Sequence, residues 1–155
     1  MPHLLPEEPY FAHPSEREVW TALKDQLPPD AYLLGSLEIQ DPDVGAMEAD
    51  LIVIWPGQGV VVIEVKGGHV TLSNTGQWRQ NDRNEQRSID PFGQAKRAQY
   101  ALHRWIQRKL ELPAMRTAVM VVLPHSFVPN SLDRIGEPRT NIADQTDIPT
   151  LADKV

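Results

Sequence analysis

Three charged residues at the ends of two apolar segments are suited to bind a divalent cation and a phosphate. Asp50 precedes the apolar run 51–55, and Glu64 and Lys66 close the run 60–66. Hard cations such as Mg²⁺ and Mn²⁺ take oxygen ligands and commonly use one or two protein carboxylates, leaving the other positions to water and phosphate. A nearby lysine orients the attacking water or offsets charge in the transition state. These residue types are those of a metal-dependent phosphodiesterase.

A β-hairpin would bring these three charged groups together. Both runs are rich in β-branched residues, and Pro56-Gly57-Gln58-Gly59 between them is typical of a turn. Antiparallel pairing returns Asp50 to the neighbourhood of Glu64. Alternate residues of a strand share a face, so Lys66 points with Glu64, whereas Val65 points into the core. Each charged residue alone is more often a solvated strand-edge residue; the set of three favours a site.

A helix is expected to begin near Ser15, because the segment 15–18 has the form of a capping box. In this interpretation Glu18 reaches back to the cap. Glu16 instead falls on the helical face of the apolar residues Trp20 and Leu23. An acid on that face either belongs to the site or interacts only with the helix dipole, and the sequence leaves both interpretations open.

A second helix is expected to begin at Asp90, a good N-cap that is followed by Pro91. Gln94 lies one turn into this helix, and Lys96 lies in the same region. Gln94 shares the apolar stripe that Ala98, Ala101, Leu102, Trp105 and Ile106 continue. A buried amide needs hydrogen-bond partners, so Gln94 is a further candidate for the site.

The remaining segments complete an α/β pattern. Strands are expected over 32–39 and 69–73, and the continuous apolar run 117–123 indicates a strand buried on both faces. Asp41 and Asp43 are interpreted as turn residues and Trp78 as a packing residue. His69 is not assigned to the site, because no second histidine follows it at metal-ligand spacing. The resulting order predicts a three-layer α/β fold, with a central mixed β-sheet flanked by helices.

Five short elements occur in the order of a known family. They are Ser15-Glu16-Arg17-Glu18-Val19, Glu48-Ala49-Asp50, Ile63-Glu64-Val65-Lys66, Gly76-Gln77-Trp78 and Asp90-Pro91-Phe92-Gly93-Gln94. Over roughly residues 14–123 the chain resembles NERD, the nuclease-related domain of the PD-(D/E)xK nuclease superfamily. It departs from the superfamily pattern in having Ala49 where proline is usual. Ala98, four residues after Gln94, stands where related nucleases have tyrosine.

The resemblance implies a restriction-endonuclease-like core that hydrolyses DNA with Mg²⁺ or Mn²⁺. Its implied metal ligands are Asp50, Glu64 and the carbonyl of Val65, and Lys66 would assist the attacking water. The resemblance also implies that the site is organised by Glu16 and Gln94. Supporting positions are expected for Glu48, which shares the face of Asp50, and for Lys96.

The distribution of charge along the chain allows a nucleic-acid surface despite a net charge of −6. Residues 1–75 carry 3 basic and 12 acidic groups, whereas residues 76–110 carry 8 basic and 3 acidic groups. A basic surface beside an acidic metal site suits DNA, and RNA stays open. Phosphate contacts are expected from a polar loop containing Arg79, Arg83 and Arg87. A solvated helix face is the interpretation for Arg104, Arg108 and Lys109.

Length and composition indicate one domain with flanking segments. We expect an N-terminal extension over 1–13, a nuclease-like domain over 14–128, and an irregular tail or linker over 129–155 that leads to a further domain. Domains of this family are often linked to helicase or kinase-like modules, so a covalently attached helicase or ATPase is expected. The chain itself has no phosphate-loop motif.

The sequence also bears on location and on other functions. There is no cysteine, and neither a signal peptide nor a membrane-spanning segment is recognisable, so a cytoplasmic protein without a membrane partner is expected. An alternative to the nuclease is an inactive nucleic-acid-binding accessory domain. A protein-binding module is a third interpretation. The sequence indicates neither whether the nuclease would act as an endo- or an exonuclease nor the oligomeric state of the chain.

Overall fold

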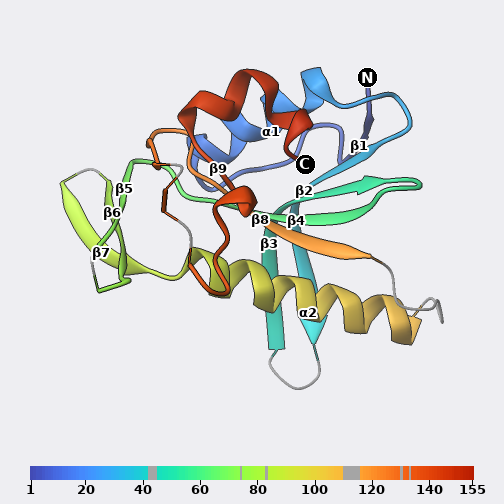
Figure 1. Cartoon of the computed structure of the whole chain (residues 1–155). Helices are drawn as coiled ribbons and strands as arrows, with labels where there is room; N and C mark the ends of the chain where they lie inside the picture. Colours follow the sequence, from blue (N-terminus) through green and yellow to red (C-terminus); the bar gives the residue numbers. More distant parts are fainter. Residues whose placement is uncertain (42–44, 74, 83, 110–115, 130, 133) are drawn as a thin grey trace.

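A computed structural model describes residues 1–41, 45–73, 75–82, 84–109, 116–129, 131–132 and 134–155 (Figure 1). The elements are β1 (His3–Leu5), α1 (Pro14–Gln26), β2 (Tyr32–Asp41), β3 (Gly45–Trp55), β4 (Gly59–Val65), β5 (His69–Leu72), β6 (Trp78–Asp82), β7 (Glu85–Ile89), α2 (Pro91–Lys109), β8 (Thr117–Val122), β9 (Ile142–Ala143) and the short 3₁₀ helices η1 (Arg139–Asn141) and η2 (Gln145–Asp153). Within these described ranges, no helix is both long and apolar enough to cross a membrane.

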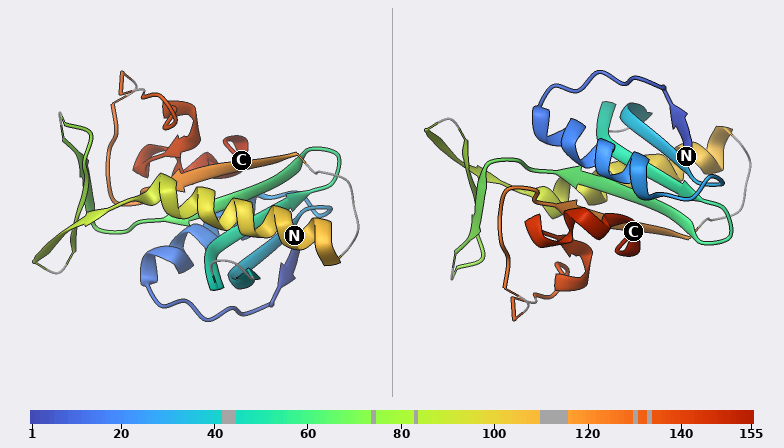
Figure 2. Two further views of the ribbon diagram at one scale, coloured as in Figure 1. Left: turned by 90° about the horizontal axis from the view of Figure 1, so that it is seen from below. Right: turned by 90° about the horizontal axis from the view of Figure 1, so that it is seen from above.

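A six-stranded mixed sheet forms the centre of the molecule, with strand order β1-β2-β3-β4-β8-β9. Neighbouring strands from β2 to β4 are antiparallel, and the other pairs are parallel. Helix α2 lies along one face of the sheet, and α1 and η2 lie on the other (Figures 1 and 2). The predicted three-layer α/β fold is confirmed, and it is consistent with a restriction-endonuclease-like core.

The alternation of side chains in β3 and β4 builds a core on both faces of this sheet. Leu51, Val53 and Ile63 pack in one cluster with the apolar side of α1. Ile52 and Val62 pack in the other cluster with α2. Both strands are buried on two sides, which is why their sequences are continuously apolar. Asp50 and Glu64 continue the second of these faces at the end where the apolar run stops.

Helix α2 begins as predicted, but its apolar stripe is narrower than expected. The Asp90 side chain accepts a hydrogen bond from the Gly93 amide at 3.1 Å, so Asp90 is the N-cap. Ala98 and Ala101 are buried against the sheet, as expected. Trp105 is 40% exposed, because it lies at the border of the buried stripe rather than within it.

The segment after β5 forms strands where a polar loop was expected. β6 pairs with β5 and β7, which gives a three-stranded ribbon at one end of the molecule (Figure 2). Trp78 and Gln80 face inward and are only 4% exposed. The exposed side of this ribbon is polar, so its sequence lacks a clear alternation of apolar and polar residues that would indicate strands. Trp78 is a packing residue, as predicted; it lies beside the Phe92 ring and donates a hydrogen bond to Glu137.

The C-terminal segment closes the fold, which corrects the expectation of an irregular tail without a closing element. β9 pairs with β8 through Ile142 and Ala143 and forms the sixth strand of the sheet. η2 packs on α1, where the Gln26 side chain donates to the Ile148 carbonyl at 2.8 Å and accepts from the Ala152 amide at 2.9 Å. The buried apolar residues of this segment lie among polar residues, so the sequence shows no helical or strand periodicity there. Linkage to a further domain stays a prediction.

Replacement of Leu151 by alanine tests whether this segment is part of the fold. Leu151 is fully buried in the cluster with α1, so we expect the free energy of unfolding to fall by about 2–5 kcal/mol, measured by urea denaturation. Ile135→Ala is the matched control, because Ile135 is completely exposed and its loss leaves stability unchanged. Equal stabilities of the two variants would contradict the packing described.

Candidate active site

The strands β3 and β4 separate at the end of the sheet where the acidic residues lie. Their ladder ends at the pair Leu51 and Ile63. Beyond it, the Asp50 carboxylate takes the place of a backbone partner, and its Oδ2 accepts a hydrogen bond from the Val65 amide at 2.9 Å. Glu64 meanwhile pairs with β8 on the other side. The separation opens space between the strands just where the two carboxylates stand.

A cavity of about 330 Å³ occupies this end of the sheet. It is lined by all five residues that the sequence analysis assigned to catalysis: Glu16, Asp50, Glu64, Lys66 and Gln94. They come from four elements or their ends, namely the first turn of α1, β3, the end of β4 and the first turns of α2. The hairpin prediction correctly placed Asp50 near Glu64, and Val65 is buried in the core as expected.

Burial dominates the electrostatics of the carboxyl groups. Asp50 and Glu64 are 9% and 6% exposed. The pKa of Asp50 is raised to about 9, chiefly by burial and then by the Glu64 charge and a hydrogen bond with Glu16, while the hydrogen bond from the Val65 amide lowers it. Burial also raises the pKa of Glu64, and the Lys66 ammonium partly offsets this effect by lowering it. The Nζ of Lys66 lies 3.2 Å from Glu64 Oε1. The site therefore holds a proton at neutral pH unless another cation replaces it.

The first turn of α1 places Glu16 differently from the sequence interpretation. The helix begins at Pro14 with His13 as N-cap, and Glu16 Oε2 accepts a hydrogen bond from the His13 amide at 3.0 Å. Glu16 therefore supplies the capping carboxylate, a role that was expected of Glu18. Glu18 instead lies 2.8 Å from His125 Nε2. Glu16 is 5% exposed and lines the cavity, so capping and the site use the same side chain.

Gln94 presents a polar atom that lacks a partner. Its Oε1 is buried and has no hydrogen-bond partner within the described part of the chain. A buried acceptor of this kind is normally satisfied, and an exception calls for a ligand, an ion or a water molecule. Gln94 lines the same cavity as the carboxylates. Its orphaned oxygen is therefore available to a ligand, an ion or a water molecule in this cavity.

Comparison with known protein families agrees with this geometry. The family model of the nuclease-related domain, NERD, matches residues 12–124. The chain belongs to the nuclease-related domain family. The match covers the range 14–123 over which the resemblance was seen, and it is consistent with the PD-(D/E)xK nuclease superfamily. No curated protein and no solved structure matches the chain.

The donor set of this nuclease-related domain fits a hard divalent cation. Mg²⁺ is usually held by one or two carboxylates together with water and phosphate, and Asp50 and Glu64 supply such a pair. The cavity of about 330 Å³ between these carboxyl groups and the orphaned oxygen of Gln94 leaves space for a cation and its water shell. Over the described ranges, no three His, Cys, Asp or Glu residues form a metal cluster supplied by the protein alone.

Of the two residues predicted to support the site, the structure places one in the cavity and the other outside it. Glu48 lines the cavity as expected. Lys96 points away from it, because its Nζ donates to the Gly136 carbonyl at 2.6 Å and lies over the Phe92 ring. Arg97 lines the cavity instead, and the sequence analysis did not single it out.

Of the three arginines expected to contact phosphate, the structure describes two, and these two do not share a face. Arg79 and Arg87 lie on opposite faces of the ribbon, since Arg79 pairs with Ser88 and Arg87 pairs with Gln80. Arg87 shares the inner face of the ribbon with the buried Gln80, and its Nε donates to Gln80 Oε1 at 3.2 Å. Arg83 lies outside the described residues.

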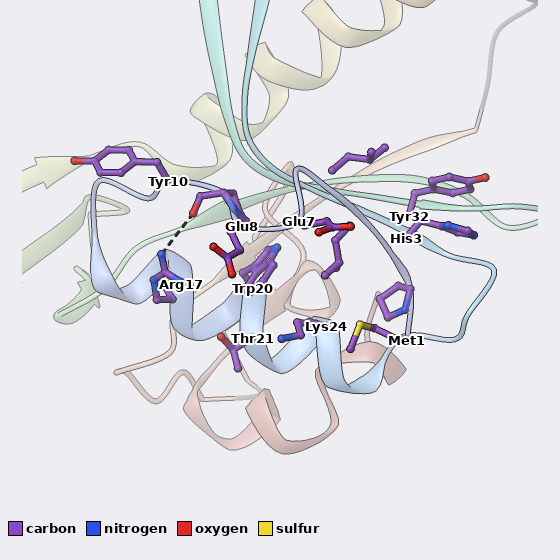
Figure 3. Close-up of a pocket in the computed structure, with 14 residues that line it drawn as sticks. Met1, His3, Glu7, Glu8, Tyr10, Arg17, Trp20, Thr21, Lys24 and Tyr32 are labelled. Carbon is purple, nitrogen blue, oxygen red and sulfur yellow. Dashed lines mark hydrogen bonds between the residues drawn. The ribbon is translucent and has the colours of Figure 1, made fainter.

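A larger cavity of about 1160 Å³ lies between the N-terminal segment and α1 (Figure 3). Around it Glu7 and Glu8 balance Arg17 and Lys24. Lys24 lies over the Trp20 ring, 5.3 Å from its centre. None of the predicted site residues lines this cavity. Its size therefore does not make it the site of the nuclease-related domain.

Proposed function

We propose that this nuclease-related domain hydrolyses DNA phosphodiester bonds with the help of Mg²⁺ or Mn²⁺. The observation that supports this most strongly is the convergence of Asp50, Glu64 and Lys66 in one cavity with the orphaned Gln94 oxygen. A domain kept only for packing has no need of three buried carboxyl groups beside a lysine. Burying such groups costs stability unless they are paired or bind a cation.

Each residue has a role in the proposed reaction. Asp50, Glu64 and the Val65 carbonyl would hold the cation, which supplies charge stabilisation and a more acidic water. Lys66, held at 3.2 Å by Glu64, orients the attacking water and offsets charge on the phosphorane. Glu16 shares a hydrogen bond with Asp50 and so fixes that carboxyl.

The choice of DNA rests on charge and on the family. The segment 76–110 is basic and contributes Arg87 and Arg97 beside the acidic cavity. A positive surface beside a metal site guides a polyanion. Membership of a larger, helicase-linked DNA-processing protein is part of the same proposal and rests on the resemblance alone.

Replacement of Lys66 by alanine tests the role of the ammonium. We expect kcat to fall by about 10²–10³-fold, as when one group that stabilises transition-state charge is removed. Cleavage of labelled single-stranded, double-stranded, nicked and flapped DNA and of RNA, with and without Mn²⁺, gives the rate. Lys96→Ala is the matched control, because Lys96 points away from the cavity, and it keeps the wild-type rate.

The same assay distinguishes the main alternative. An inactive accessory domain would bind DNA with an affinity that falls steeply with salt, yet it would show no metal-dependent cleavage. Cleavage that survives both Lys66→Ala and Asp50→Asn would come from a contaminating enzyme, and the proposed function would then be rejected.

A further inference from the structure

A second cavity, of about 190 Å³, adjoins the acidic one. The two cavities share three lining residues, His13, Val65 and Lys66. The second continues from Lys66 between the first turn of α1, the segment 67–68 and the inner face of the ribbon, where Arg87 lies. We call it the basic cavity.

The two cavities differ in the charge of their linings. Four carboxyl groups line the acidic cavity, those of Glu16, Glu48, Asp50 and Glu64. Among the described residues around the basic cavity there is no Asp or Glu, whereas Lys66 and Arg87 are both present. A cation is favoured on one side of Lys66 and an anion on the other. A phosphodiester substrate with a metal at the scissile group needs both environments side by side.

Arg87 is held in place by a chain of hydrogen bonds. Gln80 is 4% exposed, and its Nε2 donates to the Gly67 carbonyl at 2.7 Å. Its Oε1 accepts from Arg87 Nε at 3.2 Å. A guanidinium has five N–H donors, so this bond orients Arg87 while using one of them. The buried glutamine thus orients a charged side chain that lines the basic cavity.

The floor of the basic cavity is equally constrained. A Cβ atom at Gly67 would lie 2.6 Å from Ser15 Cβ and 2.7 Å from Ser15 Oγ. Only glycine lets the first turn of α1 come this close to the chain after β4. His125 fixes the next residue, because its Nδ1 accepts from the Gly68 amide at 2.9 Å. The positive end of the α1 dipole adds to the field of the two cations.

We propose that the basic cavity binds a second phosphate group of the substrate, distinct from the scissile one, with Arg87 and Lys66 as its charged contacts. The identity of the ligand rests on the proposed nuclease function; the preference for a phosphate group rests on the cavity itself. That phosphate belongs either to a neighbouring internal phosphodiester or to a terminal phosphomonoester. Charge-assisted, bidentate contacts from arginine suit either group.

Titration with inorganic phosphate tests the cavity without cleavage. In ¹H–¹⁵N NMR spectra of the metal-free chain, phosphate is expected to shift the amide signals of Gly67 and Gly68. Arg87→Gln is expected to weaken this binding by at least about tenfold, because a charge-assisted contact is lost. Arg79→Gln is the matched control, since Arg79 lies on the opposite face of the same ribbon. Wild-type phosphate affinity in Arg87→Gln, or no shift at Gly67 and Gly68, would overturn the proposal.

Oligonucleotides then identify the source of the phosphate. Three single-stranded DNA substrates are compared, with free hydroxyl ends, with a 5′-phosphate and with a 3′-phosphate. An equal rise of KM for all three in Arg87→Gln assigns an internal phosphodiester, and a rise confined to one phosphorylated substrate assigns that end. Cleavage with the same KM in the Arg87→Gln and Arg79→Gln variants rejects the subsite but leaves the nuclease. Phosphate binding that depends on Arg87 without any cleavage rejects the nuclease but leaves the anion site.

Discussion

Replacing Asp50 by asparagine is expected to abolish metal-dependent cleavage, with kcat/KM lowered by at least about 10³-fold. A cation contributes several kcal/mol of charge stabilisation to phosphoryl transfer, and each 1.4 kcal/mol corresponds to about tenfold in rate. Asparagine keeps the size of the side chain, and its carbonyl can still accept the hydrogen bond from the Val65 amide. The amide nitrogen then faces the site, where a negative oxygen is needed.

The fold of this variant is expected to remain intact, which separates lost chemistry from lost structure. Mn²⁺ binding measured by calorimetry should disappear together with activity, while the circular dichroism spectrum is unchanged. Asp25→Asn is the control, because Asp25 is an exposed residue of α1; it keeps both metal binding and activity. Wild-type Mn²⁺ affinity in Asp50→Asn would remove Asp50 from the metal site.

The metal-free protein is expected to lose stability as the pH rises from about 4 to about 9. The ordinary pKa of the Asp50 carboxyl is 3.8, and burial raises it to about 9 in the folded chain. Between these values the folded state holds a proton that the unfolded state has released. Unfolding therefore releases a proton, and a higher pH favours unfolding. This contribution to stability is complete below pH 4 and is lost by pH 9.

The melting temperature measures this effect. One proton per molecule corresponds to at most about 1.4 kcal/mol per pH unit, or roughly 3–5 °C per unit for a chain of this size. Asp50→Asn should flatten the dependence, and saturating Mn²⁺ should raise the melting temperature most at high pH, where the proton is absent. A slope that is the same in wild type and Asp50→Asn would show that Asp50 is not the group that titrates.

Short-range periodicity was enough to predict most of the site. Antiparallel pairing about one turn placed Asp50 beside Glu64, and the strand period placed Lys66 with them. The helical period placed Glu16 and Gln94 on faces that point inward. These predictions depend on residues a few positions apart, where backbone geometry fixes direction before any tertiary contact forms.

The helical period also distinguishes Lys96 from Arg97. Two residues along a helix turn the side chain by about 200°, so Lys96 faces away from Gln94, whereas Arg97, three residues along, returns towards it. On a helix, proximity along the chain is therefore not proximity in space. The helical period alone predicts that Arg97, and not Lys96, lies on the side of Gln94.

Other features depend on contacts that no local pattern reveals. The bond between Gln26 and the Ile148 carbonyl spans 122 positions of the chain. The role of Glu16 as capping residue depends on the exact first residue of α1, and helix ends are the least certain part of a sequence interpretation. The strands of the ribbon are exposed on one side, so their polarity resembles that of a loop.

The hydrogen bond from the Val65 amide to Asp50 has a consequence for affinity. One carboxylate oxygen is tied to the backbone of β4, so the side chain has already lost its rotational freedom in the folded chain. The entropy of ordering this ligand is therefore lost during folding and not when a cation arrives. A metal bound as proposed would meet a preorganised oxygen, and its binding free energy would be reduced by the removal of water and of the proton rather than by the ordering of this side chain.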